Sequence, residues 1–440
     1  MATIVSTSLS AQQLSAEQSN PQQTQYMQGY PPPAEKRINA RDGSFFEFPA
    51  LRYSVCHMRE FMPTVGVERL NRTPVHCFER EIDNNIDNLT FTPTGADTTI
   101  TFAESLGLNY TDGMLILHRG RIVYERYLGE LTPERVHAVM SVTKSLTGTI
   151  ASVLAVEGVI DTTKTVAYYI PELAESGFGD ATVRQVMDMT TAIKYSEDYT
   201  DPEAEVWKFS AAGNAMIDHP AGTPQGYYDY LPQIVKVGEH GNVFGYRTVN
   251  SDVLGWIIAR ASGKTVAELM QEWFWSRMGM ELDAYYQVDA LGIPFAGGGF
   301  NAGLRDLARF GEMIRCGGLW RGVQIIPQAA IDDITKGGRA EPFARSAYNK
   351  SLPGWSYRDM WWKSNNANGA FMARGVHGQA IYIDPTAEMV IVRLASSDKA
   401  SNTLLDATSL PAYETVAEYL INSKCKIQND LGNVREIRER

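Results

Sequence analysis

The chain has 440 residues, of which 44% are hydrophobic and 10% aromatic, and this content is enough to build a large packed core. Forty basic and fifty-one acidic residues give a formal net charge of −11 without long blocks of like charge, which argues against a nucleic-acid partner. No apolar run approaches the ~20 residues of a membrane span, and no basic region followed by an apolar stretch opens the chain. The sequence therefore predicts a cytoplasmic protein that binds neither membranes nor nucleic acids.

The cysteines and histidines show no spacing typical of a metal site or a disulfide framework. The four cysteines are far apart in sequence, and no two of the seven histidines lie within five positions of each other. Zinc sites and paired-histidine motifs need short, regular spacings. We therefore expect reduced thiols and an activity that uses neither a metal ion nor an organic cofactor.

The composition divides the chain into a long central unit and two terminal segments. Residues 1–40 are rich in Gln, Ser, Thr and Pro, and this composition predicts a flexible tail. Between residues 41 and 425, aromatic and aliphatic residues recur without a long linker or a fixed-period repeat, which predicts one domain. Residues 426–440 are predicted to form a charged C-terminal tail.

Two strand hairpins, one near each end of this domain, indicate the type of sheet. Residues 113–127 hold two β-rich runs joined through Gly120, and residues 380–394 hold two more, joined through a Pro-containing turn. Strands near both ends of the domain with helical patterns between them predict an α+β fold. Its antiparallel sheet would come from about residues 100–130 and 370–425 and be flanked by helices, and residues from about 160 to 350 would form an inserted, mainly helical region. Helical patterns lie at 145–157, 183–189, 251–262, 265–278 and 303–315.

The run Ser141-Val142-Thr143-Lys144 contains a candidate nucleophile and its base. A Ser three residues before a Lys, at the start of a helical pattern, places both side chains on one face within a turn. A serine hydroxyl becomes a good nucleophile when a neighbouring base takes its proton, and a lysine can do so when burial lowers its pKa. A helix that starts at Ser141 would also offer backbone N–H groups to an oxyanion. The spacing alone also fits a capped surface helix with an exposed lysine.

Two downstream segments supply the other groups that such a site needs. Tyr246 precedes a helical pattern that begins near Ser251, where its phenol can carry a proton; packing on Trp256 is the alternative. Gly375 and Gly378 precede the strand near 380, and glycines let a strand edge approach a ligand closely. One backbone N–H of this edge would be a second oxyanion donor.

At these three places the sequence resembles the penicillin-recognising serine hydrolases, the superfamily of class C β-lactamases, related esterases and D-amino-acid peptidases. Within it, the chain is similar to the 6-aminohexanoate-dimer hydrolase (nylon-oligomer hydrolase) group. The resemblance spans roughly residues 100–420. Besides the run at Ser141, it rests on residues 113–127, 244–256, 297–311 and 375–385. The order and spacing of these segments are more specific than any one of them. The resemblance implies a β-lactamase/penicillin-binding-like fold and an acyl-enzyme mechanism.

The resemblance also implies roles for individual residues. Ser141 would attack a carbonyl with Lys144 as general base, and Tyr246 would carry the proton to the leaving group. The backbone N–H groups of Ser141 and Val376 would form the oxyanion hole.

Four more residues would contact the substrate by the same resemblance: Tyr199 at the leaving amide nitrogen, Trp362 (or Trp361) as an apolar wall, and Gly375 and His377 at the strand edge. Ordinary core packing is the alternative for the aromatic residues.

Two departures from the β-lactamase pattern argue against lactamase activity. Thr248 stands where Tyr-x-Asn would place its Asn, and Ala373-Arg374-Gly375 stands where Lys-Thr-Gly would. Whether Arg374 or His377 replaces the missing lysine charge stays open. Lys336-Gly337-Gly338 lacks a following strand pattern and is interpreted as the end of a helix.

Two other interpretations use the same residues. Ser141, Asp252 and His377 could be drawn as a catalytic triad, but no G-x-S-x-G elbow and no βαβ rhythm accompany them. A non-catalytic ligand sensor is the second alternative, although a binding module needs no base beside its serine. The sequence therefore predicts a serine hydrolase for a small-molecule substrate, an amidase for small linear amides with ester hydrolysis as the alternative. It leaves the oligomeric state open, a homodimer included.

Overall fold

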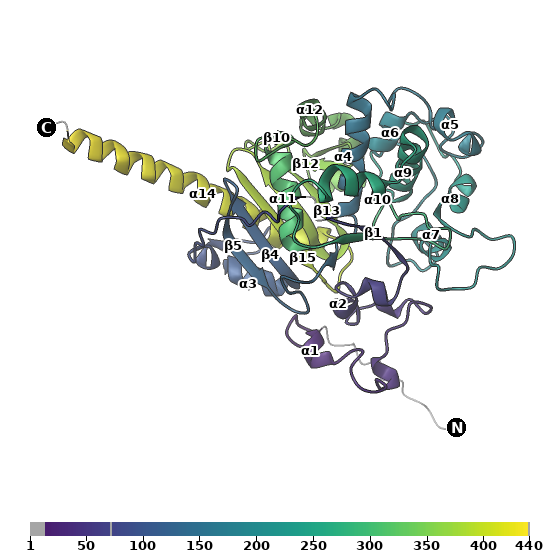
Figure 1. Cartoon of the computed structure of the whole chain (residues 1–440), viewed down its shortest axis with the longest axis horizontal. Helices are drawn as coiled ribbons and strands as arrows, with labels where there is room; N and C mark the ends of the chain where they lie inside the picture. The colour runs from purple at the N-terminus through teal and green to yellow at the C-terminus, as the bar shows by residue number, and fades with distance from the viewer. Residues whose placement is uncertain (1–13, 71–72, 439–440) are drawn as a thin grey trace.

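The computed structural model describes residues 14–70 and 73–438, with side chains up to residue 423. A seven-stranded antiparallel sheet lies at its centre, in the order β11-β12-β13-β14-β15-β4-β5 (Figure 1). Both predicted hairpins are present, as β4–β5 and β14–β15, and β15 pairs with β4 to join them. The predicted antiparallel sheet is therefore confirmed, but its predicted extent is not, because residues 356–358 and 361–363 add two strands and residues 403–425 are helical. The strands are β4 (Thr111–His118), β5 (Arg121–Tyr127), β11 (Ser356–Arg358), β12 (Trp361–Lys363), β13 (Phe371–Gly375), β14 (Gln379–Asp384) and β15 (Met389–Ala395).

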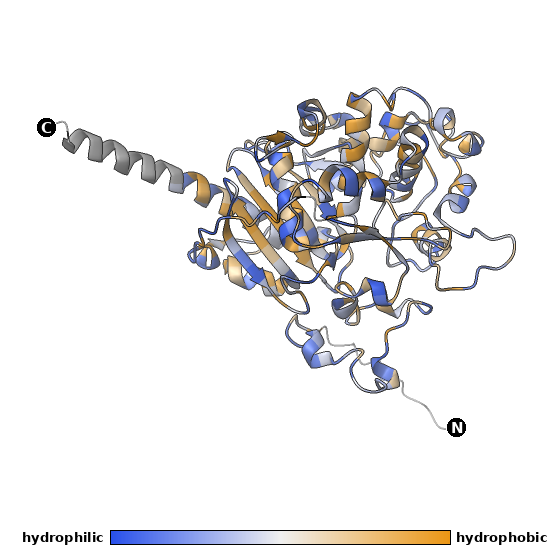
Figure 2. Cartoon of the chain, viewed as in Figure 1, coloured by the Kyte–Doolittle hydropathy of each residue, from blue (hydrophilic) through white to orange (hydrophobic). Residues whose placement is uncertain are grey.

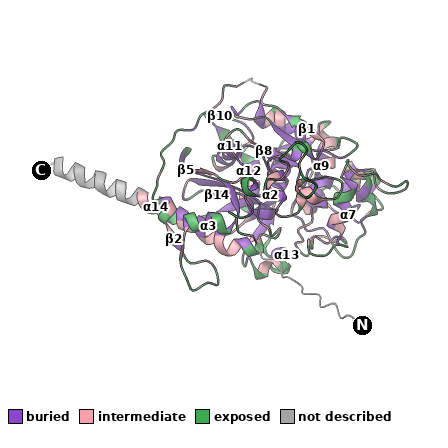
Figure 3. Cartoon of the chain, turned by 90° about the horizontal axis from the view of Figure 1, so that it is seen from below, coloured by how far each residue is buried: buried purple, intermediate pink, exposed green. Residues whose placement is uncertain are grey.

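Helices cover both faces of this sheet. On one face, Gly311 of α11 (Leu304–Arg315) lies against Val390 and Ile381. On the other, Tyr413 of α14 (Thr403–Arg438) packs against Tyr382, with ring centres 5.3 Å apart. Since neighbouring strand residues point to opposite faces, the helices sandwich β14 and β15, which explains why both strands are buried along their whole length. Figures 2 and 3 show these strands as hydrophobic and buried.

A second, smaller sheet has the order β1-β7-β8-β6 and was not predicted. Its strands come from distant parts of the chain, so no local hairpin pattern in the sequence indicates most of their pairings. They are β1 (Thr64–Val67), β6 (His137–Ala138), β7 (Ala284–Gln287) and β8 (Phe300–Ala302). Two short hairpins, β2 (Thr90–Phe91) with β3 (Ile100–Thr101) and β9 (Leu319–Trp320) with β10 (Val323–Gln324), lie outside both sheets.

The predicted helical patterns all correspond to helices. The pattern at 265–278 becomes α10 followed by a π-helical turn at Gln271–Trp275, and Gly337 ends α12 as predicted. Within the described residues the α-helices other than α11 and α14 are α1 (Pro21–Thr24), α2 (Leu51–Ser54), α3 (Phe102–Leu108), α4 (Val142–Val156), α5 (Val166–Tyr169), α6 (Val183–Met187), α7 (Glu205–Ala212), α8 (Tyr227–Tyr230), α9 (Val249–Ser262), α10 (Val266–Met270), α12 (Gln328–Lys336) and α13 (Ala340–Ala344).

Helix α4 is the central helix of the domain. Its residues 142–154 are all buried, and it contacts α9, α10, α12 and β13. Gly148 makes part of this packing possible, because a Cβ there would lie 2.1 Å from the carbonyl oxygen of Asp359. The helix that begins beside Ser141 is therefore a core element.

The N-terminal segment, residues 14–62 of the described chain, packs on the rest of the domain. Tyr110 Oη donates a hydrogen bond of 2.7 Å to the carbonyl of Leu14, and Ser19 is fully buried. A small apolar cluster follows, formed by Ile38, Ala40, Ala50, Phe61 and Met62. Over residues 14–40 the structure thus gives packed contacts where the composition predicts a flexible tail. Residues 1–13 of that predicted tail lie outside the described residues.

Helix α14 continues through most of the segment predicted as a charged tail, and its C-terminal half extends away from the body (Figure 1). Among the described residues, no helix combines the length and the apolar character of a membrane span.

Candidate active site

Ser141 and Lys144 are in direct contact at the start of α4. Lys144 Nζ donates to Ser141 Oγ at 2.8 Å and to the carbonyl oxygen of Gly297 at 2.6 Å. Ser141 is the N-cap residue directly before α4, and its hydroxyl makes no capping hydrogen bond. Lys144 is only 1% exposed. The alternative of a capped surface helix with an exposed lysine is therefore wrong.

The surroundings of Lys144 favour its neutral form. Burial lowers the pKa of Lys144 from 10.5 to about 8, because the ammonium is poorly solvated there. The negative charges of Glu197 and Asp252 act in the opposite direction and raise this pKa. Near pH 8 a large fraction of the side chain is thus an uncharged amine, which can accept a proton from Ser141.

Tyr246 completes the group at Ser141. Its hydroxyl is hydrogen-bonded to Ser141, and Lys144 Nζ lies 5.2 Å from the centre of its ring. Burial raises the pKa of Tyr246 well above its usual value, and the charge of Glu197 acts in the same direction. Trp256, the partner in the alternative interpretation, instead stacks on Tyr228 at 4.3 Å. The three residues predicted to form the catalytic group therefore lie together.

Strained backbone flanks the two predicted oxyanion donors. Met140, directly before Ser141, has φ = 48°, and His377, directly after Val376, has φ = 62°. The left-handed backbone conformation costs a non-glycine residue on the order of 1 kcal/mol, and residues with such strain are often found at functional sites. Gly375 brings the two segments close together, since a Cβ on it would lie 2.7 Å from the carbonyl oxygen of Val139.

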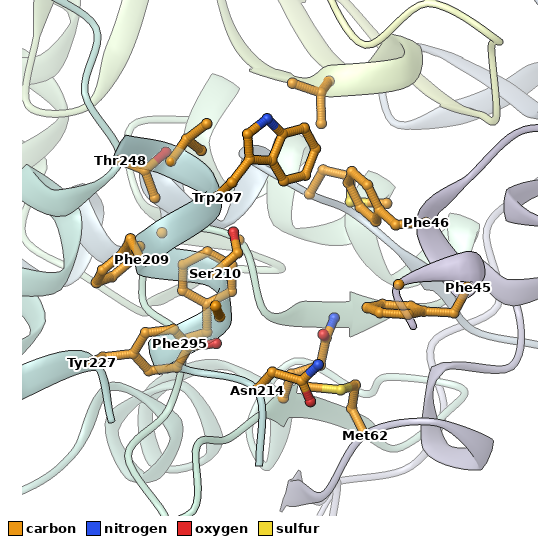
Figure 4. Close-up of a pocket in the computed structure, with 18 of the residues that line it drawn as sticks. Phe45, Phe46, Met62, Trp207, Phe209, Ser210, Asn214, Tyr227, Thr248 and Phe295 are labelled. Atoms are coloured by element: carbon orange, nitrogen blue, oxygen red, sulfur yellow. The ribbon is translucent and has the colours of Figure 1, made fainter. Parts of the chain in front are cut away.

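Two cavities meet at this group. The larger, of about 360 Å³, borders Ser141, Lys144 and Val376 and extends between the N-terminal segment and α7 (Figure 4). The smaller, of about 110 Å³, borders Tyr246 and Arg374. Tyr199 and Val376 line both cavities.

Three of the four predicted substrate contacts line a cavity. Tyr199 borders both, and Trp362 and Gly375 border the smaller one. Trp361, the alternative to Trp362, is a core residue whose indole N–H donates to Thr149 Oγ1 at 3.1 Å.

His377 does not fit its predicted role. Its Nδ1 donates to the carbonyl oxygen of Ser397 at 2.7 Å, and its ring packs edge-on against Phe46. Burial lowers the pKa of His377 to about 4, and among the described residues it lines neither cavity. The prediction of a substrate contact by His377 is not supported, and the alternative triad lacks its histidine.

A family model for β-lactamases matches residues 111–410. The chain belongs to the β-lactamase family. It is a hydrolase of that family, with the β-lactamase/penicillin-binding-like fold that the sequence motifs imply.

Two proteins named 6-aminohexanoate-dimer hydrolase are similar to this β-lactamase family member. One, from Paenarthrobacter ureafaciens, is 34% identical over 355 residues, which cover 80% of this chain and 87% of the relative. The other, a solved structure from Bacillus anthracis, is 33% identical with a TM-score of 0.78 over 88% of this chain and 98% of that one. The hydrolase EstCE1, which has promiscuous acyltransferase activity, shares the fold at 16% identity, with a TM-score of 0.56 over 71% of this chain and 98% of its own.

Two acids act on Lys144 in a way that the sequence did not predict, although Asp252 also appears in the alternative triad. Glu197 Oε1 accepts the backbone N–H of Thr248 and borders the smaller cavity. Asp252 is buried next to Lys144, and burial raises its pKa to about 8. No local pattern marks these acids as buried, because acidic residues are usually exposed.

Arg374, a candidate to replace the charge of the missing lysine, forms an ion pair with Asp406. Arg374 Nη2 donates to both carboxylate oxygens of Asp406, at 2.5 and 2.7 Å. The Arg374 guanidinium also lies over the ring of Trp362, 5.0 Å from its centre. Within the part of the chain that the structure describes, no cluster of three or more His, Cys, Asp or Glu side chains is placed to hold a metal ion.

Proposed function

We propose that the chain hydrolyses the amide bonds of small linear substrates through an acyl-enzyme on Ser141. The observation that carries this proposal is the 2.8 Å contact between Ser141 Oγ and a buried Lys144 whose pKa lies near 8. A base with a pKa close to the working pH is suited to general-base catalysis, because it is both sufficiently basic and sufficiently deprotonated.

The reaction would begin with attack of Ser141 Oγ on the substrate carbonyl carbon while its proton passes to the neutral amine of Lys144. The carbonyl oxygen becomes an oxyanion held by the backbone N–H groups of Ser141 and Val376. The hydroxyl of Tyr246 then gives its proton to the leaving nitrogen, the C–N bond breaks, and the proton on Lys144 returns to Tyr246. Water would release the acyl group by the same steps in reverse.

Amides are preferred over esters for two reasons. Tyr199 lines both cavities, which supports the contact with a scissile amide that the resemblance implies for it. Both similar proteins named 6-aminohexanoate-dimer hydrolase carry an amide substrate in their name. Ester hydrolysis is the second candidate, because the same acyl-enzyme forms from esters and EstCE1 shares the fold.

Active-site labelling would test the proposal. A fluorophosphonate probe should modify Ser141, identified by peptide mass spectrometry, and the modification should disappear in Lys144→Ala. Lys336→Ala, which removes an exposed lysine, is the matched control and should be labelled like the wild type. A panel of p-nitrophenyl esters, anilides and short amide oligomers would then rank the substrates. Absence of labelling at Ser141 at every pH would refute the acyl-enzyme and favour a ligand sensor.

A further inference from the structure

The two cavities border different members of the catalytic group. Ser141 and Lys144 line the larger cavity, Tyr246 lines the smaller one, and Val376 lines both. If Tyr246 gives its proton to the leaving nitrogen, as the proposed function holds, the leaving amine must occupy the smaller cavity. The carbonyl would then lie at the shared border beside Val376, and the acyl chain would continue into the larger cavity.

Apolar side chains form most of the wall of the larger cavity. Figure 4 shows Phe45 and Phe46 of the N-terminal segment on one side, across from Trp207 and Phe209 of α7. Met62 and Phe295 also border the cavity (Figure 4). These residues offer a bound chain no charged partner along its length.

Among the described residues, three charged side chains border this cavity: Lys144, Arg41 and Asp42. Lys144 belongs to the catalytic group, while Arg41 and Asp42 are exposed. A charge buried without a partner loses its hydration, and the apolar side chains of this wall would not compensate for that loss.

The volumes give a scale for what each cavity can enclose, and both cavities are partly open to solvent. A cavity of about 150 Å³ is known to take one benzene ring, so about 360 Å³ has room for roughly twice as many carbon atoms. The smaller cavity, at about 110 Å³, has room for fewer than six non-hydrogen atoms by the same scale.

We propose that the larger cavity is the acyl subsite and that it selects uncharged linear alkanoyl chains of roughly six to twelve carbon atoms. The inference rests on the proposed function and adds its substrate class. A small amine leaves through the cavity beside Tyr246. The N-terminal segment, through Phe45 and Phe46, is a determinant of this selectivity.

Isosteric amides provide the first test. N-heptanoyl-ethanolamine and N-(6-aminohexanoyl)-ethanolamine have the same leaving group and the same chain length, and differ in a terminal methyl against a terminal ammonium. We expect kcat/KM at least tenfold higher for the heptanoyl compound. From butanoyl to octanoyl, kcat/KM should rise by up to about fourfold per added CH₂, the factor that full burial of a methylene supplies. Equal or better turnover of the 6-aminohexanoyl compound would overturn the inference.

A pair of variants provides the second test. Phe46→Ala opens the wall and should flatten the chain-length dependence, with a severalfold loss for octanoyl and little change for butanoyl. Phe48→Ala removes the same ring two residues away, where it packs on Tyr110 and does not border the cavity, and should keep the wild-type profile. Identical profiles for the two variants would remove the N-terminal segment from the subsite. If no ethanolamide is cleaved and Ser141 is not labelled, the proposed function itself fails; turnover with the opposite selectivity overturns only the acyl subsite.

Discussion

Gly375→Ala is the substitution that most directly tests the proposed oxyanion hole. The new Cβ would stand 2.7 Å from the carbonyl oxygen of Val139, whereas ordinary contacts begin near 3.4 Å. The two backbone segments must therefore separate by about 0.7 Å. One segment leads into Ser141 and the other into Val376, so the separation falls on the two proposed N–H donors.

The expected effect is a loss of catalysis with nearly normal substrate binding. Removal of one oxyanion donor costs about 10²–10³ in kcat, and a partial displacement should cost about 10 to 100-fold. Overpacking of this kind also costs roughly 1–3 kcal/mol of stability, which a domain of this size should survive. Steady-state kinetics would give kcat and KM, and thermal unfolding would verify the fold.

Gly66→Ala is the control for Gly375→Ala. Gly66 also lies in a strand, β1, but a Cβ there would meet only the Glu68 side chain, at 3.6 Å. This variant should keep the wild-type kcat. If folded Gly375→Ala has a kcat within about twofold of the wild type, the assignment of Val376 to the oxyanion hole is wrong.

Three further predictions concern the base, the leaving group and the core. Because only neutral Lys144 accepts a proton, kcat/KM should rise with pH through about 8. Glu197→Gln should move this rise in the pH profile to lower pH, since loss of the anion lowers the pKa of Lys144. An unchanged pH profile would exclude the influence of Glu197 on Lys144. Tyr199→Phe should reduce kcat/KM for amides more than for esters of the same acyl group, and equal losses would remove one reason for preferring amides. Gly148→Ala places a Cβ 2.1 Å from a backbone carbonyl oxygen and should lower the melting temperature by several degrees or prevent folding, whereas Gly107→Ala, with open space around it, should leave the melting temperature within a degree or two of the wild type.

Local patterns in the sequence predicted the parts of the molecule that depend on local chemistry. Turn residues between β-rich runs indicate a strand hairpin, and the two predicted hairpins of the main sheet are where the patterns placed them. The contact between Ser141 and Lys144 also follows from helix geometry, because residues three apart share a face.

The remaining features depend on contacts between distant segments. Glu197 and Asp252 act on Lys144 from loops and helices more than fifty residues away, and no sequence pattern marks them as buried. His377 lines neither cavity and instead contacts Ser397 and Phe46, two residues that are distant from it in sequence. Composition alone suggested a flexible tail for residues 1–40, yet one-sided burial of a few residues such as Ile38 and Ala40 is enough to anchor a polar segment.

The packing of the N-terminal segment has a practical consequence for recombinant work. The family match begins at residue 111, whereas Phe45, Phe46 and Met62, which line the larger cavity, all precede it. A protein trimmed to the matched boundaries would keep Ser141, Lys144 and Tyr246 while leaving one side of that cavity open to water. Expression plasmids should therefore start upstream of residue 41, and mutant libraries aimed at new substrates should include Phe45, Phe46 and Met62, which lie outside the matched region.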